Sequence, residues 1–117
     1  MLINVTAYLL VLERVGEARS TAREALDIAV EIQSDIHLAV AIQHLGAVAA
    51  RCGDAVRAAQ LLGYADAAYA RLETSREPTE AAEYERAMAV LGERLPADDL
   101  LALLQAGASL TYEQAKC

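Results

Sequence analysis

The sequence contains no Trp and no Phe, and only two Pro, two Cys and a single Lys among its 117 residues. The β-branched and aromatic residues that strands favour are sparse after the first part of the chain. Alanine is instead the most abundant residue type, and it is accompanied by Leu, Glu and Arg, which are strong helix formers. Because 56% of the residues are hydrophobic and 23% are charged, the chain is predicted to fold rather than to stay disordered. We therefore expect an all-α domain.

Long apolar runs and disulfide patterns are also missing. Two cysteines, Cys52 and Cys117, are too few for a disulfide framework, and they favour a reducing compartment. The opening stretch MLINVTAYLLVL has no basic segment before it and no small-residue cleavage site after it. Glu13 and Arg14 end it well short of the ~18 apolar residues of a membrane span. These features predict a cytoplasmic chain that does not associate with a membrane.

Basic residues are outnumbered, since 17 acids face 10 bases and the net charge is −7. The excess lies toward the end of the chain, where the segment from Glu73 onward has 9 acids and 4 bases. An acidic surface without a Lys/Arg cluster repels phosphate backbones, so direct nucleic-acid binding is not expected. A P-loop needs Lys and Ser/Thr after a glycine-rich loop, and the only lysine is Lys116. The sequence therefore excludes nucleotide hydrolysis by this segment.

Caps and breaks divide the chain into predicted helices. Ser34 is a predicted N-cap, Gly53 marks a turn, Pro78 with Thr79 restarts the chain, and Thr111 with Gln114 resembles a capping box. The predicted helices cover residues 4–14, 16–33, 35–51, 55–75, 80–94 and 96–107, and a short terminal turn begins at residue 111.

The first two thirds of the chain contain an internal repeat with a constant offset between its two units. Six apolar or small residues of the first unit align with six of the second: Leu2, Val5, Leu9, Ala18, Ala22 and Ala25 align with Ile42, Leu45, Ala49, Ala58, Leu62 and Ala65. Periodic units of this size indicate stacked helix pairs.

The second unit resembles the tetratricopeptide repeat. Ile42, Leu45-Gly46 and Ala49 match the first-helix pattern of the family, and Gly53-Asp54 stands at the turn between helices. The second-helix pattern of small and bulky residues appears as Ala58, Leu62 and Ala65. The resemblance implies antiparallel helix pairs stacked as a short right-handed α-α superhelix. Gly46 and Ala58 would allow close approach of the two helices.

The resemblance also sets the expected organisation of the chain. It implies a single helical-repeat domain over residues 1–117, with repeat one at about 2–33, repeat two at about 35–75 and atypical C-terminal capping helices at about 78–116. The period, which leads from Leu2 to Ile42, is longer than that of the family, so longer helices are implied. The predicted repeat-packing residues are Leu45, Gly46, Gly53, Ala58, Leu62 and Ala65.

A second resemblance covers residues 58–115. The phrases AAQLLGYADAAYARL, EYERAMAVLGERL and LLQAGASLTYEQA are similar, in this order, to the C-terminal end of large bacterial predicted ATPases and transcription regulators. It implies that the chain is a C-terminal sensor or scaffold segment, and that any ATPase or DNA-binding parts of a parent protein lie outside it.

Residues with reactive side chains form no catalytic pattern. His37 and His44 lie seven residues apart, whereas zinc ligands on one helix are usually three or four apart, so we interpret them as a partly exposed pair and expect no metal. A reactive thiol at Cys52 is less favoured than a small packed residue at a helix end. Glu80 is interpreted as a first-turn acid, as are Asp98 and Asp99.

The tyrosines Tyr64, Tyr69 and Tyr84 are spaced for packing, which favours a place in the core over a ligand site. No cofactor is expected, and the sequence predicts a protein without enzymatic activity.

The predicted function is protein–protein interaction through a helical-repeat scaffold. In the tetratricopeptide family, ligands commonly lie along the concave face, and the matching positions here are Asn4, Gln43, His44 and Arg51. Two alternatives stay open. One is a small-molecule effector pocket between the repeats and the C-terminal helices, near Tyr64 or Tyr84, and the other is a purely structural cap of a longer solenoid.

The apolar beginning of the chain predicts self-association. Leu2, Ile3, Val5, Leu9, Leu10 and Val11 are more apolar side chains than an inner helix face needs. Burying each is worth roughly 1.5–3 kcal/mol, so a cover is expected. Twofold pairing is the commonest closed arrangement, and we therefore expect a homodimer through the first two helices.

Overall fold

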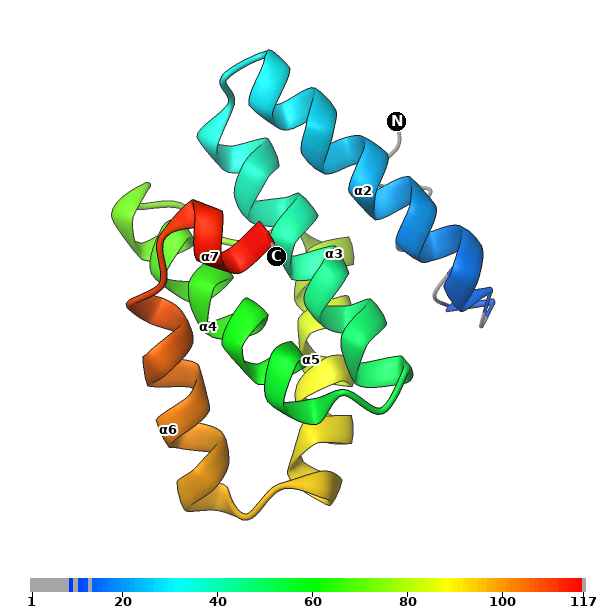
Figure 1. Cartoon of the computed structure of the whole chain (residues 1–117), viewed down its shortest axis with the longest axis vertical. Coiled ribbons are helices and arrows are strands. Elements are labelled where there is room, and N and C mark those ends of the chain that lie inside the picture. Colours follow the sequence, from blue (N-terminus) through cyan, green and yellow to red (C-terminus); the bar gives the residue numbers. More distant parts are fainter. Residues whose placement is uncertain (1–8, 10, 13, 117) are drawn as a thin grey trace.

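The computed structural model describes residues 9, 11, 12 and 14–116, and this part of the chain contains six principal α-helices and no strand. The helices are α2 (Val15–Glu31), α3 (Asp35–Arg51), α4 (Ala55–Arg71), α5 (Pro78–Arg94), α6 (Ala97–Ala108) and α7 (Tyr112–Lys116) (Figure 1). The predicted all-α class is confirmed for these residues. Most of the predicted helix over residues 4–14 lies outside the described part.

Three helix ends recur at equal intervals along the chain. The backbone turns left-handed at Gln33, Gly53 and Glu73, with φ angles of 55°, 86° and 51°. After each, the next amide reaches back to a carbonyl five residues earlier, as in the bond from Ser34 N to Ala29 O at 3.1 Å. Helices α2, α3 and α4 each have 17 residues, and their first residues are spaced as regularly as these turns. Two of these intervals together equal the offset of the internal repeat. Helices α2 and α4 therefore occupy equivalent positions in its two units.

Side chains cap three of the six described helices, at Ser34, Asp54 and Thr111. Ser34 accepts from the amide of His37 at 3.3 Å, and the predicted capping box is confirmed by bonds of 2.9 and 3.2 Å between Thr111 and Gln114. Helix α5 starts at Pro78, earlier than the predicted residue 80, and its N-cap residue is Glu77. Helix α4 ends at Arg71 rather than at residue 75, since the left-handed turn at Glu73 stops it.

Helix α3 is the centre of the packing. It contacts α2 on one side, α4 on another and α5 on a third. Eleven of its 17 residues are buried, so it has almost no solvent-facing side between Ala39 and Ala50. Such burial on all sides matches its sequence, DIHLAVAIQHLGAVAAR, which is apolar nearly all round.

The α3–α4 seam has the predicted small residues at its contact. A Cβ atom on Gly46 would lie 3.1 Å from Leu62 Cδ2, which shows how close the helices are. The predicted packing residues Leu45, Gly46, Ala58, Leu62 and Ala65 are all buried, and Gly53 occupies the left-handed turn. Five of these residues are thus buried, whereas Gly53 is exposed at the turn between the helices.

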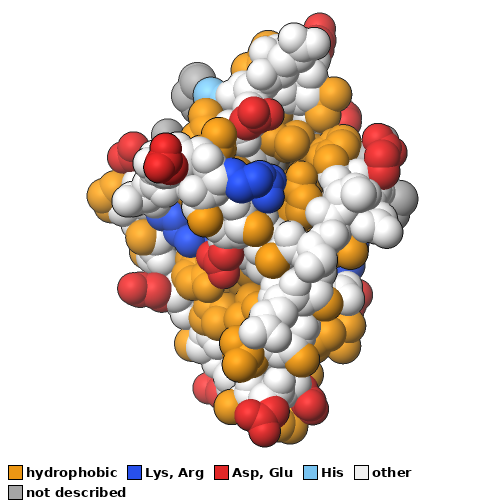
Figure 2. Space-filling model, turned by 90° about the vertical axis from the view of Figure 1, so that its left-hand side faces the viewer, with side chains coloured by type: hydrophobic (Ala, Val, Ile, Leu, Met, Phe, Trp, Pro, Cys, Tyr) orange, Lys and Arg blue, Asp and Glu red, His pale blue; other side chains and the backbone are white. Residues whose placement is uncertain are grey.

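Helices α5 and α6 diverge instead of forming a closely packed pair. Helix α5 packs mainly against α3, whereas α6 packs against α4, and the two contact each other near their connection (Figure 1). Figure 2 shows the side of the molecule that α4 and α6 form, where hydrophobic side chains cover much of the surface between charged ones. Leu101 of α6 is one of the large apolar residues left exposed.

Helices α4 and α6 cross with their backbones in close contact. A Cβ atom on Gly63 would lie 2.1 Å from the carbonyl oxygen of Leu104, and one on Gly107 would lie 2.0 Å from that of Gln60. The two helix backbones therefore touch at a reciprocal pair of glycines. Among the described residues, no helix is both long enough and apolar enough to span a membrane.

Candidate functional site

Two of the predicted concave-face residues are buried, which corrects the expectation that they face solvent. Gln43 and His44 each have 0% of their surface exposed. The physical reason is that α3 is packed by three helices, so the polar residues in its middle turn inward with the apolar ones. Their predicted role as partly exposed binding residues is therefore wrong, and Asn4 lies outside the described residues.

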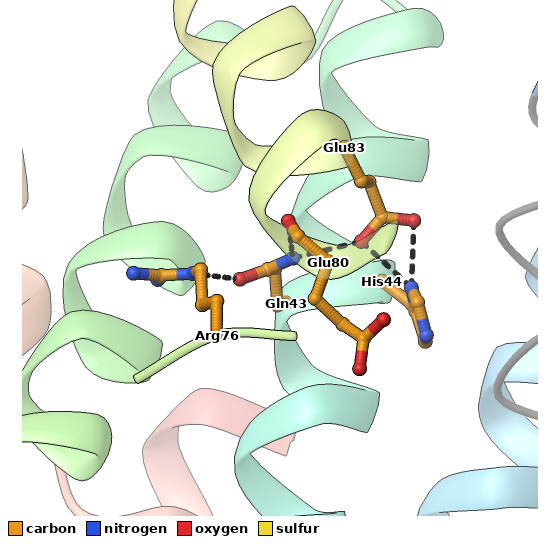
Figure 3. Close-up of polar contacts among 5 residues, drawn as sticks. All are labelled: Gln43, His44, Arg76, Glu80 and Glu83. Atoms are coloured by element: carbon orange, nitrogen blue, oxygen red, sulfur yellow. Dashed lines mark hydrogen bonds and ion pairs between the residues drawn. The ribbon is translucent and has the colours of Figure 1, made fainter. Parts of the chain in front are cut away.

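Gln43 is held by the beginning of α5 and by the preceding loop (Figure 3). Its Nε2 donates to the backbone carbonyl of Glu80 at 2.9 Å and to Oε1 of Glu83 at 3.0 Å. Its Oε1 accepts a hydrogen bond from Arg76 Nε. Three of the four hydrogen-bonding capacities of this amide are thus used inside the protein.

His44 forms a buried pair with Glu83. Its Nδ1 lies 2.7 and 2.6 Å from the two carboxylate oxygens, and Glu83 is 2% exposed. A carboxylate only accepts hydrogen bonds, so Nδ1 carries the proton in this contact. His44 Nε2 is buried without a hydrogen-bond partner. One nitrogen of the imidazole is therefore hydrogen-bonded, and the other is not.

Glu80 is a second buried acid beside this pair. It lies in the first turn of α5, as predicted, but it is only 7% exposed. Burial raises the pKa of its carboxyl group above the usual value, and the charge of His44 counteracts this in part. Figure 3 shows its carboxyl group on the same side as the imidazole.

Arg76 connects the α4–α5 loop to both helices. Its Nη2 donates to Asp66 Oδ1 at 2.7 Å, and its guanidinium lies 4.6 and 4.0 Å from the ring centres of Tyr69 and Tyr84. Tyr84 in turn donates to Asp66 Oδ2 at 2.9 Å. Burial and the neighbouring Asp66 raise the pKa of Tyr84 to about 12. The tyrosine therefore stays protonated and acts as a donor at neutral pH.

The polar cluster leaves no room for a substrate. The space beside Glu83, lined also by Arg51 and Arg86, measures about 10 Å³, which is roughly the room of one water molecule. Arg51 lies there between α3 and α5, not in an open groove with Gln43 and His44. The cluster of Gln43, His44, Asp66, Arg76, Glu83 and Tyr84 is therefore a structural tie between α3, α4 and α5.

Open space lies instead on both sides of α7. This helix packs mainly against α4, and Ala115, which is 0% exposed, belongs to an apolar cluster shared with residues of α2, α3 and α4, with Leu110 and Tyr112 packed against it (Figure 1). Arg57 of α4 donates to the backbone carbonyls of Gln114 and Ala115. These carbonyls belong to the last turn of α7, where the helix dipole is negative.

A pocket of about 260 Å³ lies at the Arg57 end of α7. Leu45, Val48, Ala49 and Leu61 contribute apolar surface to it, Arg19, Arg23 and Arg57 contribute positive charge, and Asp54 contributes one carboxylate. Arg19 Nη2 donates to Cys52 Sγ at 2.8 Å. Cys52 is exposed at the end of α3, so its predicted place as a packed residue is wrong.

A second pocket, of about 350 Å³, lies at the beginning of α7, where Tyr112 faces Tyr64 and the ends of α3 and α4. The predicted core position of Tyr64 and Tyr69 is confirmed, since they are 6% and 5% exposed. Tyr84 is half-buried. Among the described residues, no group of three or more His, Cys, Asp and Glu side chains could hold a metal ion.

One signal in the sequence could have revealed the buried cluster. A helix that is apolar on all sides is buried, and its polar residues then need buried partners. Glu80 and Glu83 are three residues apart on α5 and so share a face, which makes them the natural candidates. Arg76 stands in a loop, and nothing in its sequence neighbourhood indicates its contacts.

Comparisons with known proteins identify no relative of this chain. No family model matches the chain, and no curated protein or solved structure matches it either.

Proposed function

We propose that this chain is a protein-interaction module that binds a short helical segment of a partner in the furrow that α2, α3 and α4 line with Arg19, Leu45, Arg57 and Leu61. The observation that carries the proposal is the position of α7, because the last carbonyls of this helix accept hydrogen bonds from Arg57 of the furrow. Its contacts show how a helix fits there: a small residue, Ala115, approaches the floor closely, and Leu110 and Tyr112 pack beside it.

The charges of the furrow define the chemistry of the partner. Three arginines line one end, although the whole chain has a net charge of −7. Arg57 binds backbone carbonyls at the negative end of α7, which is the favourable arrangement for a cation and a helix dipole. A matching partner is an amphipathic helix with small apolar residues on one face, whose C-terminal end or carboxylates meet the arginines.

The wider context of the module is part of the same proposal. We propose that the helices form a tetratricopeptide-like superhelix and that the chain derives from a bacterial signalling ATPase or transcription regulator. Both parts of this proposal are based on the sequence resemblances quoted above. An in-frame nucleotide-binding module encoded directly before residue 1 would support this parentage. A purely structural cap is the alternative, and it predicts that the furrow binds no segment in trans.

Pairing of two copies is a separate proposal. Helix α2 packs mainly against α3, and it leaves Ile28 and Val30 41% and 47% exposed, with Ile32 just after it at 57%. This apolar surface, which is exposed among the described residues, supports a homodimer that involves the first two helices. Light scattering after size exclusion tests it, and a monomer at tens of micromolar would contradict it.

Displacement of α7 tests the furrow. In the full-length chain, Ala115→Glu places a charge at a fully buried position and should release α7. A synthetic peptide of residues 107–116, GASLTYEQAK, is then titrated into the isotope-labelled variant and followed by NMR. We expect shifts at furrow residues such as Leu45 and Leu61. The wild type should respond more weakly, because its tethered α7 competes at an effective concentration of about 1 mM.

The matched control is Ala108→Glu, which makes the same change at an exposed residue of α6. This variant should behave like the wild type. If a folded Ala115→Glu protein shows no furrow shifts at about 1 mM peptide, a concentration that detects weak binding, the proposed docking function is refuted.

A further inference from the structure

The pocket of about 350 Å³ at the beginning of α7 has the size of a small-ligand site. It lies between the start of α3, the end of α4 and Tyr112 of α7. Sites for small molecules range from about 300 to 1,000 Å³, so this one suits a compact ligand at the low end of the range. It is distinct from the buried polar cluster and from the arginine-lined pocket at the other end of α7.

Opposite charges border the pocket. Asp35 stands in the first turn of α3, and Arg71 stands in the last turn of α4. Both act on the hydroxyl of Tyr64, which is also part of the lining. Burial raises the pKa of Tyr64, Arg71 counteracts this, and Asp35 adds to it. Both charged residues therefore lie near the Tyr64 hydroxyl, and both are exposed.

The rest of the wall is apolar or aromatic. Leu38 and Leu72 contribute aliphatic surface, and the rings of Tyr64 and Tyr112 contribute flat surface. Together with the two rim charges, this apolar wall suits a molecule that carries both charges and an apolar body.

We propose that this pocket binds a small zwitterion of the α-amino-acid type. Arg71 pairs with its carboxylate, for which the planar guanidinium fork is well suited. Asp35 pairs with its ammonium group, and its side chain lies against the leucines and tyrosines. A simple anion would meet the charge of Asp35 without compensation, and a neutral apolar molecule would leave both rim charges unused.

A ligand in this pocket would also touch α7, because Tyr112 belongs to that helix. Binding would therefore stabilise the docked position of α7. The inference does not depend on the proposed partner binding, since the pocket is formed with α7 in place.

Three related ligands separate the two charge contacts. The isotope-labelled wild-type chain is titrated by NMR with L-leucine, with L-leucinamide, which lacks the carboxylate, and with 4-methylpentanoate, which lacks the ammonium group. L-Phenylalanine serves as a larger amino acid. We expect an amino acid to bind about tenfold more tightly than either analogue of leucine, with shifts centred on Tyr64 and Tyr112.

Charge variants assign each contact. Arg71→Gln should weaken L-leucine about tenfold without weakening L-leucinamide, and Asp35→Asn should weaken L-leucine without weakening 4-methylpentanoate. Arg94→Gln is the matched control, because Arg94 stands in the last turn of α5 as Arg71 does in α4, and it does not line the pocket. This control should keep wild-type affinity.

Each remaining outcome overturns the proposal. If neither amino acid binds the wild type at about 10 mM, the pocket is not such a site. Equal affinity for leucine and its two analogues would mean that only apolar contacts act. Undiminished leucine binding by folded Arg71→Gln would remove the carboxylate contact. The comparison of ligands on the wild type stands even if a variant fails to fold.

Discussion

The glycine crossing between α4 and α6 makes a sharp prediction about stability. Replacement of Gly63 by alanine adds a Cβ atom 2.1 Å from the carbonyl oxygen of Leu104 and 2.8 Å from its carbonyl carbon. Ordinary van der Waals contact begins near 3.4 Å, so the α6 backbone must move away by most of the difference between these distances. Rotation of a side chain cannot relieve this clash, because the opposing atoms belong to the backbone.

Two opposite effects determine the magnitude. Overpacking of a close contact costs typically about 1–3 kcal/mol, and a clash with backbone atoms belongs at the upper end of this range. Alanine is favoured over glycine inside a helix by about 1 kcal/mol. The net expected loss for Gly63→Ala is therefore about 2 kcal/mol, which lowers the urea midpoint by about 1 M for a domain of this size.

Urea unfolding followed by far-UV circular dichroism measures this loss. Gly92→Ala is the matched control, since Gly92 is also within a helix but has no atom within 4 Å of the added Cβ. The control should gain up to about 1 kcal/mol. Gly46→Ala should fall between the two, because its closest neighbours, Leu62 Cδ2 and Leu61 Cβ, are side-chain atoms. If Gly63→Ala were as stable as Gly92→Ala, the close crossing would be refuted.

A double variant examines the same crossing from both sides. Gly107→Ala produces the reciprocal clash, 2.0 Å from the carbonyl oxygen of Gln60. One separation of the helices would relieve both clashes, so the two losses should combine to less than their sum. Full additivity would show that the two glycines act independently, and it would contradict a shared crossing.

Three further predictions use the same unfolding assay. Glu83→Ala leaves the buried imidazole of His44 unpaired and should lower the free energy of unfolding by about 3–5 kcal/mol. Glu85→Ala, at an exposed residue, should lower it by almost nothing, and equal losses would contradict the buried pair. Ala58→Leu should overpack the α3–α4 seam by about 1–3 kcal/mol, and Ala70→Leu at an exposed site should cost much less, so identical midpoints would count against the seam. Burial raises the pKa of Glu80 in the native state, so the native state binds this proton more tightly than the unfolded chain does. The stability that this group contributes is therefore lost as the pH rises from the usual pKa of 4.5 through the pKa in the native state. The stability of Glu80→Gln relative to wild type should therefore increase from pH 4 to pH 7, and a constant difference would disprove the buried carboxyl.

Local rules were sufficient for much of the fold. Ser34 and the pair Thr111 and Gln114 form the capping bonds that their residue types predict. The left-handed turn at Gly53 was also predictable, because glycine adopts a positive φ without strain. The equivalent turns at Gln33 and Glu73 were not, since these residues disfavour that conformation and adopt it only through the helix-ending bonds.

The position of the polar residues depends on tertiary packing. The resemblance to the tetratricopeptide repeat predicts Gln43 on a concave surface. In the protein, α5 covers this side of α3, and Glu83 and the Glu80 carbonyl bind the amide from a distant part of the sequence. A repeat pattern describes the contacts of neighbouring helices, and it contains no information about a helix that departs from the repeat.

The glycine crossing accounts for that departure. Gly63 and Gly107 bring α6 into backbone contact with α4, and the α5–α6 connection therefore leads away from α5 instead of returning along it. Helix α5 packs against α3 instead. Gln43 and His44 of α3 therefore meet the acids in the first two turns of α5. The same path brings Leu110 and the following helix back over α3, where Arg57 holds its end. Two small residues that carry no chemistry thus decide both where the polar cluster is buried and where the furrow is occupied.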